Sequence, residues 1–317
     1  MSHASEWDAI VVGGGAAGLS AGVVLARTGI RIVLVEDRTP RNAPATHMHG
    51  FLSRDGMNPA DLLQVGREEM IGFGGKLLAA RADRVEQSTG GQFRVVLEEG
   101  SELIAPAVLL ATGLRDEVPE IPGAKELWGT LVHHCPHCHG REVAGQRIAI
   151  IGGTHAPMSV HQAALMRRYT DDVVFYLNGI DLADHERDEF SAIGVTVVND
   201  RVTRVRSSPE GALSILQESG AISTHDCAFV VPRMVPRDDA FEGLGLVRNG
   251  DTTWIDVGPT GRTSVGGVWA AGNLANPRAQ VVTAAGEGSA AAIDMSGYLL
   301  AHDLGRAVNG ESASWYV

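Results

Sequence analysis

The chain has 317 residues, 44% of them hydrophobic, which is typical of a globular protein with about two domains. Its formal net charge of -12 gives no electrostatic support for binding nucleic acid or an anionic membrane. Three cysteines are too few for a disulfide-stabilised scaffold of this length. We therefore expect no nucleic-acid or membrane partner, and a catalytic or metal-binding role for any paired cysteines.

Residues 9–26 contain no charged side chain, so hydropathy alone is consistent with a membrane span or a signal peptide. The acidic residues Glu6 and Asp8 precede this stretch, where a signal peptide has basic residues, and five glycines interrupt it. We therefore expect the stretch to belong to a folded domain, and the protein to be cytoplasmic.

The first chemical motif is "DAIVVGGGAAG" at residues 8–18, in which Gly13, Gly15 and Gly18 have G-x-G-x-x-G spacing. The flanking apolar residues predict a buried parallel strand before the glycines and a helix after them. A second apolar run, "IRIVLVE", ends at Glu36. The three glycines would permit a tight turn, the approach of a pyrophosphate and close helix–strand packing, and Glu36 can accept hydrogen bonds from a ribose. The unit therefore predicts a dinucleotide site.

A similar unit begins at Gln146 with "QRIAIIGGTHAPMSVHQAALMRR" and again predicts a strand, a glycine turn and a helix. Thr154 and Pro157 stand where the first unit has its second and third glycines. The next apolar run, "DDVVFYLNG", ends at Asn178, with neither an acid for a ribose nor an arginine pair for a 2′-phosphate. We interpret the unit as a nucleotide-binding fold with a degraded ligand site, although a register shift of one or two residues would restore part of it.

The other apolar runs place this second unit inside the first. "APAVLLATG" predicts a strand and a glycine turn, and the proline-rich "VPEIPG" after it is typical of a crossing between domains. "CAFVVPRMVPRDD" predicts a strand and the crossing back, and "GGVWAAGN" predicts a further strand and glycine turn. The expected fold is α/β, with two Rossmann-like three-layer nucleotide-binding domains, the second inserted into the first. The expected boundaries are 1–114 and 241–317 for the discontinuous outer domain, and 115–240 for the inserted domain.

The cysteine motif is "HHCPHCHG", in which Cys135 and Cys138 are surrounded by histidines. Zinc could bind such a motif, but a distant second ligand pair is lacking and consecutive ligands rarely complete a tetrahedron. A purely structural disulfide would close too small a ring to stabilise the fold. A redox pair is favoured, because a helix predicted after the motif and nearby imidazolium groups would lower a thiol pKa. Thiol–disulfide exchange also needs an acid–base group, for which His139 is the first candidate and His134 the second.

In this order the parts resemble the low-molecular-weight thioredoxin reductase family over nearly the whole chain. The resemblance rests on "GGGAAG" with Glu36, "LLATG", the C-x-x-C, and "GGVWAAGN…AQVVTAAGEG". It implies a homodimer whose outer domain binds FAD. The C-terminal glycine turn would hold the ribityl chain, where Asn273 replaces the usual Asp, and Gln280 and Val281 would lie by the flavin pyrimidine edge. The cofactor-binding residues implied are Gly13, Gly15, Ala16, Ala17, Gly18, Glu36, Asp37, Arg41, His49, Val85, Ala111, Thr112, Gly113, Gly272, Asn273, Gln280 and Val281.

Two departures separate the chain from an ordinary thioredoxin reductase. The NADPH site of the inserted domain looks degraded, and His139 follows the second cysteine where the family has Asp. "CPHCHG" and "RNAPATHMHGFLSRDG" are similar instead to flavin-dependent dithiol oxidases that form disulfides in gliotoxin- and holomycin-type natural products. This resemblance implies oxidation of a small-molecule dithiol by O2, with H2O2 formed and without a nicotinamide. The family resemblance also implies that Cys138 faces the flavin and Cys135 meets the substrate.

Two other functions stay open, namely an NADPH-dependent thioredoxin or disulfide reductase, and a flavoprotein that senses redox state without turnover. Reduction of the bound flavin by NADPH would distinguish the reductase from the oxidase. His47 and His49 would line the flavin face or serve as structural histidines. For His133 and His137, the sequence supports a plain surface position as well as it supports a role at the cysteine pair. Cys227, isolated in an apolar strand, is expected to be a buried core thiol.

Overall fold

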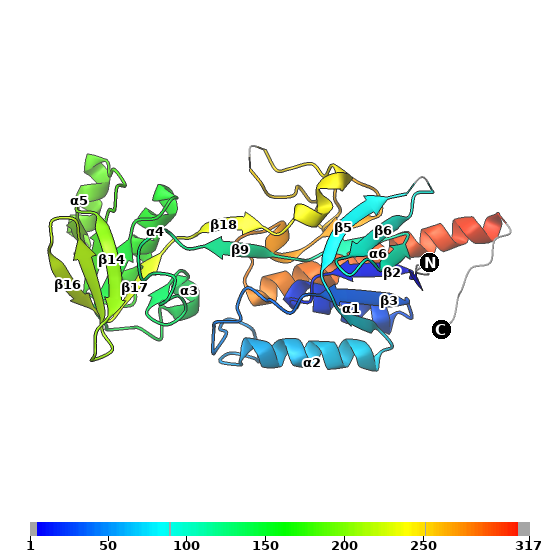
Figure 1. The fold of residues 1–317 in the computed structure, drawn as a ribbon, viewed down its shortest axis with the longest axis horizontal. Coiled ribbons are helices and arrows are strands. Elements are labelled where there is room, and N and C mark those ends of the chain that lie inside the picture. Colours follow the sequence, from blue (N-terminus) through cyan, green and yellow to red (C-terminus); the bar gives the residue numbers. More distant parts are fainter. Residues whose placement is uncertain (1–4, 89, 251, 310–317) are drawn as a thin grey trace. The chain divides into compact units, whose positions relative to one another are not determined.

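The structure is a computed structural model, and it describes residues 5–88, 90–250 and 252–309. The chain divides into two compact units. The outer unit comprises residues 1–115 and 235–317, and the inserted unit comprises residues 116–234. Figure 1 labels the helices and several of the strands of each unit.

The outer unit is organised around a five-stranded parallel sheet with the strand order β19-β8-β2-β3-β4. Its central strands are apolar on both faces, which is the pattern of a sheet covered on both sides. Alternate residues of a strand point to opposite faces, so Val11 packs in one hydrophobic cluster and Ile10 in another. The strands are β2 (Ala9–Val12), β3 (Ile32–Glu36), β4 (Lys76–Ala79), β8 (Val108–Leu110) and β19 (Val268–Ala270).

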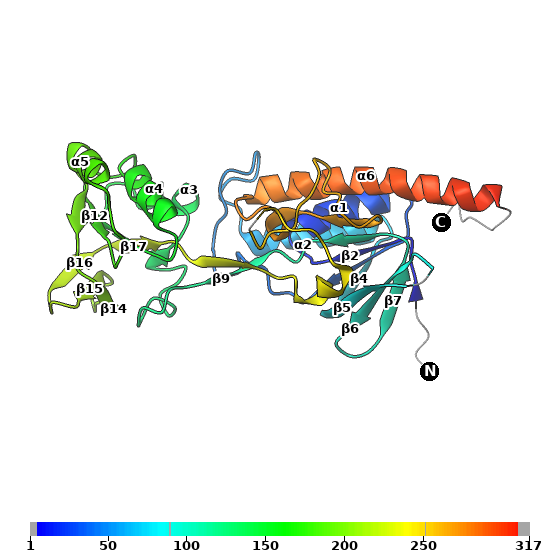
Figure 2. The ribbon, with the colours of Figure 1, turned by 90° about the horizontal axis from the view of Figure 1, so that it is seen from above.

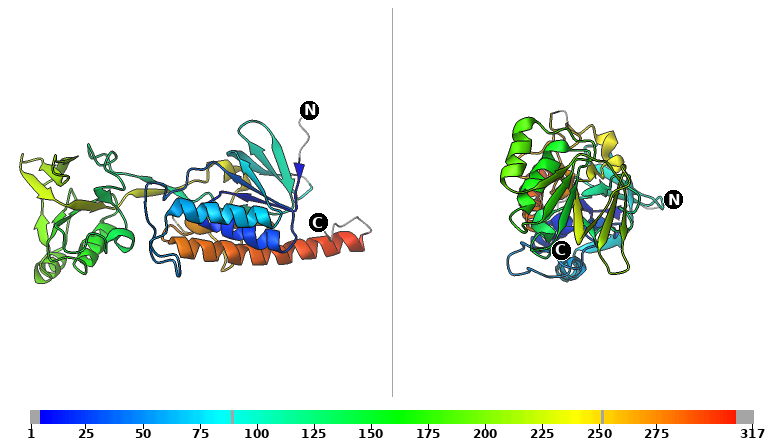
Figure 3. Two further views of the ribbon diagram at one scale, coloured as in Figure 1. Left: turned by 90° about the horizontal axis from the view of Figure 1, so that it is seen from below. Right: turned by 90° about the vertical axis from the view of Figure 1, so that its left-hand side faces the viewer.

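Three helices cover one face of this sheet, namely α1 (Ala16–Arg27), α2 (Pro59–Gly72) and α6 (Val281–Val308). Helix α1 lies between α2 and α6, as Figures 2 and 3 show. Helices α1 and α6 pack closely, since a Cβ added to Gly288 would lie 2.0 Å from the carbonyl oxygen of Ala17. The start of α1, beside the first glycine turn, is thereby held against the C-terminal helix.

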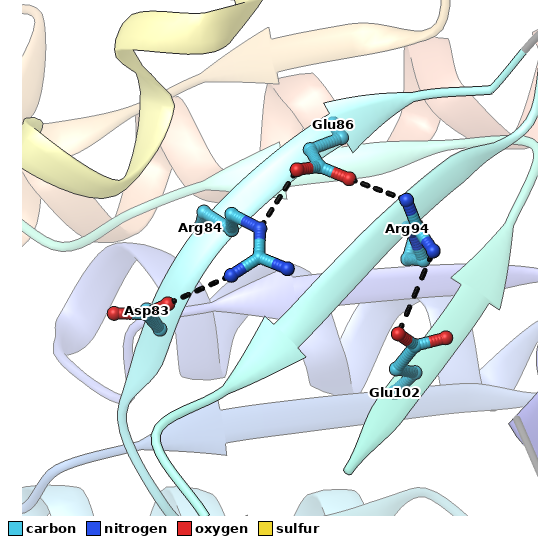
Figure 4. Close-up of polar contacts among 5 residues, drawn as sticks. All are labelled: Asp83, Arg84, Glu86, Arg94 and Glu102. Atoms are coloured by element: carbon cyan, nitrogen blue, oxygen red, sulfur yellow. Dashed lines mark hydrogen bonds and ion pairs between the residues drawn. The ribbon is translucent and has the colours of Figure 1, made fainter. Parts of the chain in front are cut away.

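A four-stranded sheet with the order β1-β7-β6-β5 covers the opposite face. Its exposed side carries a ladder of opposite charges (Figure 4), in which Glu86 accepts hydrogen bonds from Arg84 at 2.7 Å and Arg94 at 2.6 Å. Solvent screens such exposed pairs, so each contributes little to stability. The strands are β1 (Ser5–Glu6), β5 (Ala82–Gln87), β6 (Phe93–Leu97) and β7 (Glu102–Ala105).

The inserted unit repeats this architecture around a parallel sheet with the order β10-β17-β11-β12-β13. The unit also contains three helices, namely α3 (Pro136–His139), α4 (Ala156–Met166) and α5 (Asp184–Ala192). An antiparallel sheet is formed by β14 (Val202–Ser207), β15 (Leu213–Gln217) and β16 (Ile222–His225). The parallel strands are β10 (Val132–His133), β11 (Ile148–Ile151), β12 (Val173–Tyr176), β13 (Thr196–Val198) and β17 (Cys227–Val230). The predicted α/β fold with two Rossmann-like domains is confirmed.

Two strands, β9 (Leu114–Glu117) and β18 (Arg233–Pro236), pair with each other where the chain passes between the units. Pro236 suits this ribbon, because proline lacks the N–H that the interior of a wider sheet would require. Short 3₁₀ turns follow at Asp239–Leu244 and Gly272–Leu274.

The uncharged stretch at residues 9–26 forms strand β2, the glycine turn and most of helix α1. Strand β2 is fully buried in the parallel sheet, which accounts for its apolar character. Throughout the described residues, none of the helices combines the length and the apolar content needed to cross a membrane.

Candidate functional site

The glycine turn between β2 and α1 has the shape that a phosphate group requires. Gly13 has a φ of +113°, and a Cβ there would lie 2.3 Å from the carbonyl oxygen of Ala111. A Cβ on Gly18 would lie 1.8 Å from the carbonyl oxygen of Gly13, so both positions require glycine. At Gly15, in contrast, a Cβ would meet no described atom within 4 Å. Gly15 is also the N-cap of α1 and gives the helix no side-chain cap, so the first-turn amides of Ala16 and its neighbours suit a pyrophosphate.

Glu36, at the end of β3, lies beside this turn and is 3% exposed. Its carboxylate abuts Gly14, where a Cβ would lie 2.1 Å from Oε2. Arg67 of α2 donates two hydrogen bonds to it, from Nε to Oε1 at 2.7 Å and from Nη2 to Oε2 at 3.0 Å. Each carboxylate oxygen keeps a second lone pair, so Glu36 can accept ribose hydroxyls while Arg67 fixes its orientation. Sequence reasoning missed Arg67, because a partner on another helix leaves no local pattern.

Asn273 lies in the C-terminal glycine turn and is held on both ends of its amide. Its Nδ2 donates to the carbonyl oxygens of Asn276 and Ala279, each at 3.0 Å. Its Oδ1 accepts a hydrogen bond of 3.2 Å from Arg41, which lies in the loop after β3. The predicted residues Asn273 and Arg41 are therefore neighbours, although 232 positions separate them in the sequence.

The same turn leads into the start of helix α6. Gly272 has a φ of +69°, and its N–H donates to Glu287 Oε2 at 2.9 Å. Gln280 is the N-cap of α6 and Val281 is its first residue. The positive end of this long helix suits an electron-rich carbonyl, as the pyrimidine edge of a flavin provides.

Arg237 links the loops that follow β3 and β8, and sequence reasoning did not single it out. Its N–H donates to the carbonyl oxygen of Gly113 at 3.0 Å, and its own carbonyl accepts from Thr112 Oγ1 at 2.6 Å. Its guanidinium donates to the carbonyl oxygen of Thr39 at 3.0 Å and lies 3.8 Å from the Asp37 carboxylate. The predicted residues Asp37, Thr112 and Gly113 therefore share one edge of the parallel sheet.

Val85, His49 and His47, which were considered for the cofactor, have side chains that contact other parts of the protein. Val85 is 1% exposed in the core and pairs with β6, so its side chain packs in the protein. The ring nitrogen Nδ1 of His49 lies 3.3 Å from the Asp55 carboxylate. His47 is exposed, and its Nδ1 lies 3.0 Å from Thr46 Oγ1.

The cysteine motif lies in the inserted unit, where Cys135 and Cys138 form a disulfide with their Cα atoms 5.2 Å apart. The helix predicted after the motif is not formed, because residues 141–147 are turns that lead into β11. The single turn α3 lies inside the motif instead, with Pro136 at its first position. Cys135 is buried at 8% exposure, whereas Cys138 is partly exposed. The disulfide therefore joins two residues that differ in their access to solvent.

The histidines around the disulfide occupy different environments. The surface position considered for His133 is wrong, because β10 places it opposite Phe229 of β17 and leaves it 7% exposed. Burial, aided by the nearby His139 and His134 rings, lowers the pKa of His133 to about 4. Its ring stacks on His139, with centroids 4.4 Å apart, whereas His134 stacks on Trp128 at 5.6 Å. Within the described chain, no cluster of three or more His, Cys, Asp or Glu residues is arranged to hold a metal ion.

His137 is the exposed member of the four, as considered from the sequence. Cys227 is 2% exposed in β17, and burial raises the pKa of its thiol to about 12. The expectation of a buried core thiol is therefore confirmed.

The second glycine turn, between β11 and α4, is closed by its own side chains. The N–H of Gly153 donates to Ser159 Oγ at 3.1 Å, and the N–H of Met158 donates to His155 Nδ1 at 3.2 Å. His155 is the N-cap of α4, so an imidazole holds an amide of the helix end where a phosphate would bind. Pro157 removes a further N–H from this first turn.

Asn178 follows β12 at the position where a ribose-binding acid would stand. Its φ is +50°, and its Nδ2 donates to the carbonyl oxygen of Gly152 at 2.9 Å. Its Oδ1 accepts from the N–H of Val202 at 3.1 Å. Both ends of the amide therefore hold the protein backbone, in contrast to the acid in the first unit.

Residues 7–288 match the family described as pyridine nucleotide-disulphide oxidoreductase. "Thioredoxin reductase sirT" of Leptosphaeria maculans is 29% identical over 95% of this chain and 96% of its own length. "Bifunctional thioredoxin reductase/thioredoxin" of Mycobacterium leprae (strain TN) is 31% identical, over 95% of this chain and 68% of its own length.

Among solved structures, HlmI is 43% identical with a TM-score of 0.92, and the match covers 98% of each chain. The putative thioredoxin reductase TrxB of Bacillus anthracis is 29% identical with a TM-score of 0.87, covering 93% of this chain and 99% of its own. Together with the open cradle at Gly15 and the disulfide at Cys135, these similarities establish the class of protein. The chain belongs to the pyridine nucleotide-disulphide oxidoreductase family, as a thioredoxin reductase-like flavoprotein that uses FAD in thiol–disulfide chemistry.

Proposed function

We propose that this protein oxidises a small-molecule dithiol to a disulfide in natural-product biosynthesis, with O2 as the final acceptor and H2O2 as its product. The observation that carries the proposal is the Cys135–Cys138 disulfide, which shares the single turn α3 with His139, and histidine is the usual acid–base residue of proteins. The 43% identity to HlmI over almost the whole chain supports the resemblance to holomycin-type dithiol oxidases.

The two units would divide this work. The outer unit, whose bounds the sequence predicted as 1–114 and 241–317, would bind FAD. The inserted unit, whose bounds the sequence predicted as 115–240, would carry the redox cysteines. When bound, FAD would supply the two-electron redox chemistry that connects the reduced cysteine pair to O2. We also propose that the protein is a cytoplasmic homodimer. Light scattering would measure its mass and so test the dimer.

The thiol chemistry balances within the protein and its substrate. A substrate thiolate attacks Sγ of Cys135, the Cys135–Cys138 bond breaks, and Cys138 leaves as a thiolate. The second substrate thiolate attacks the substrate sulfur of the mixed disulfide and releases Cys135. Two electrons thereby move from the substrate to the cysteines, and both substrate thiols lose their protons. His139 would accept a proton from an attacking thiol and return one to a leaving thiolate.

The second glycine turn favours an oxidase over a nicotinamide-dependent enzyme. The amides of Gly153 and Met158 are bonded to side chains of the turn, and Asn178 is bonded to the backbone at both ends. A pyrophosphate would have to break these contacts, and a ribose would meet no acid. The alternative is an NADPH-dependent thioredoxin or disulfide reductase, which the names of the similar thioredoxin reductases favour.

Anaerobic stopped-flow reduction of the bound flavin separates the two functions. Dithiothreitol, as the probe dithiol, should bleach the flavin, and NADPH or NADH at millimolar concentration should do so slowly or not at all. Air should then restore the flavin colour with one H2O2 formed per flavin. Rapid, saturable reduction by NADPH would overturn the oxidase proposal and favour the reductase.

Single cysteine variants test the assignment of the two sulfurs. Cys138→Ser leaves Cys135 as a thiol, whose thiolate should attack a linear disulfide probe such as oxidised glutathione, form a mixed disulfide and release one glutathione thiolate. This adduct should persist, because no Cys138 thiolate is present to resolve it. Cys135→Ser should form no such adduct in intact-protein mass spectrometry. Adduct formation by Cys135→Ser alone would show that the two roles are reversed.

A further inference from the structure

In the inserted unit, three histidines of the cysteine motif stack on other rings, and their stacking partners differ. His133 stacks on His139 with 4.4 Å between ring centroids and 23° between ring planes. On another side it meets Phe229, with centroids 5.5 Å apart and planes tilted by 46°. His134 stacks on Trp128 instead, at 5.6 Å and 15°. Each candidate acid–base ring therefore has its own aromatic neighbour, and only that of His139 is an imidazole.

His133 is the fixed member of the stacked pair that it forms with His139. It belongs to β10, whose register with β17 places it opposite Phe229, and it is 7% exposed. His139, in contrast, is the last residue of the single-turn helix α3 and is partly exposed. A side chain at the end of such a short helix has several rotamers open to it unless a neighbour restricts them.

We propose that His133 is a positioning residue, which holds the ring of His139 by stacking and so makes His139 the acid–base group of the cysteine pair. The inference rests on the proposed thiol oxidation. It assigns His133 no proton transfer of its own, because its burial between Phe229 and His139 favours the uncharged ring. The surface of His133 that matters is its flat face, so another flat apolar ring should replace it.

A double-mutant cycle tests this assignment, with the anaerobic rate of flavin reduction by dithiothreitol as the readout. The variants are His133→Phe, which keeps a ring, His133→Leu, which keeps only apolar bulk, His139→Ala, and the His133→Leu/His139→Ala double variant. Both His133 variants lose the same imidazole nitrogens, so the difference between them isolates the stacked ring. Thermal unfolding of each variant confirms that the fold persists.

His139→Ala should slow the reduction by roughly 10²-fold or more, the usual effect of losing an acid–base group. His133→Leu should slow it by about 5- to 10-fold, the scale of one aromatic stack, and His133→Phe should recover most of the rate. The double variant should be no slower than His139→Ala, since His133 acts through that ring.

Three results would overturn the inference while leaving the proposed function intact. These are a His133→Leu rate equal to that of the unaltered protein, equal losses in His133→Phe and His133→Leu, and a further loss when His133→Leu is added to His139→Ala. If dithiothreitol fails to reduce the flavin of the unaltered protein, both the proposed function and this inference are overturned.

Discussion

At the scale of single residues, Glu36 has two tasks that depend on each other. A carboxylate with 3% exposure needs partners, because burying an unpaired charge is costly. Arg67 supplies two hydrogen bonds, and the remaining lone pairs of the carboxylate could accept the ribose hydroxyls that we propose for this site. Arg67 therefore satisfies the buried charge of Glu36 and fixes the orientation of its carboxylate.

Glu36→Ala should weaken FAD binding, because the ribose loses hydrogen bonds to a charged group worth about 1.5–3 kcal/mol each. Quenching of flavin fluorescence in a titration of apoprotein measures the dissociation constant. Glu98→Ala is the matched control, since Glu98 is an exposed acid of the same unit, 57% exposed. An unchanged dissociation constant for Glu36→Ala would contradict the ribose assignment.

Local spacing was enough to predict the glycine turn at residues 13–18 and the position of Glu36 at the end of the next strand, since strand, turn and acid are consecutive in the chain. It could not predict Arg67, whose pairing with Glu36 spans 31 residues and two elements. It could not predict the burial of His133 either. Strand β10 is only two residues long, so its apolar pattern is too short to distinguish a strand from a loop.

At the scale of elements, the two glycine turns share one strand–turn–helix shape but differ in what their polar groups contact. Both turns need glycine for close approach, since a Cβ on Gly152 would lie 2.1 Å from the carbonyl oxygen of Leu177. In the second turn the polar groups are bonded to one another, and Asn178 joins the turn to β14 through Val202. The apolar runs predicted both strands correctly, but only the structure reveals these internal contacts.

Asn178→Ala should lower the free energy of unfolding by about 1–3 kcal/mol, because two backbone groups lose their partner. It should also add strain, since alanine at a φ of +50° is disfavoured. Asn178→Gly, which tolerates this φ, should be the milder change, and urea denaturation compares the two. A glycine variant less stable than the alanine variant would contradict a role for the backbone conformation.

At the scale of the whole molecule, the inserted unit carries two buried neutral histidines, His133 and His225. His225 is 1% exposed, and its Nε2 lies 2.8 Å from the hydroxyl of Tyr176. Burial, with a smaller effect of the nearby Arg147 charge, lowers the pKa of His225 to about 4, close to that of His133. Both groups bind protons more readily in the unfolded chain, where a histidine has a pKa of about 6.5.

The inserted unit should therefore lose stability in acid. The stabilisation is fully present above about pH 6.5 and falls as the pH drops toward about 4, by up to about 3 kcal/mol per histidine. Urea midpoints at pH 7.5 and 5.0 measure the loss, and His225→Gln should reduce it. His185→Gln, at an exposed position on α5, should leave it unchanged. Equal midpoints at the two pH values would contradict the prediction.

The burial of Cys227 makes its thiol less reactive than those of reduced Cys135 and Cys138. With a pKa of about 12, its thiol supplies almost no thiolate at neutral or mildly alkaline pH, and only the thiolate is readily alkylated. An alkylating reagent therefore discriminates by folding state, since the reduced native protein offers Cys135 and Cys138 alone. Alkylation of Cys227 therefore reports unfolding. The number of alkylated cysteines in one mass spectrum would show both whether Cys135 and Cys138 are reduced and whether the protein has unfolded, without any engineered cysteine.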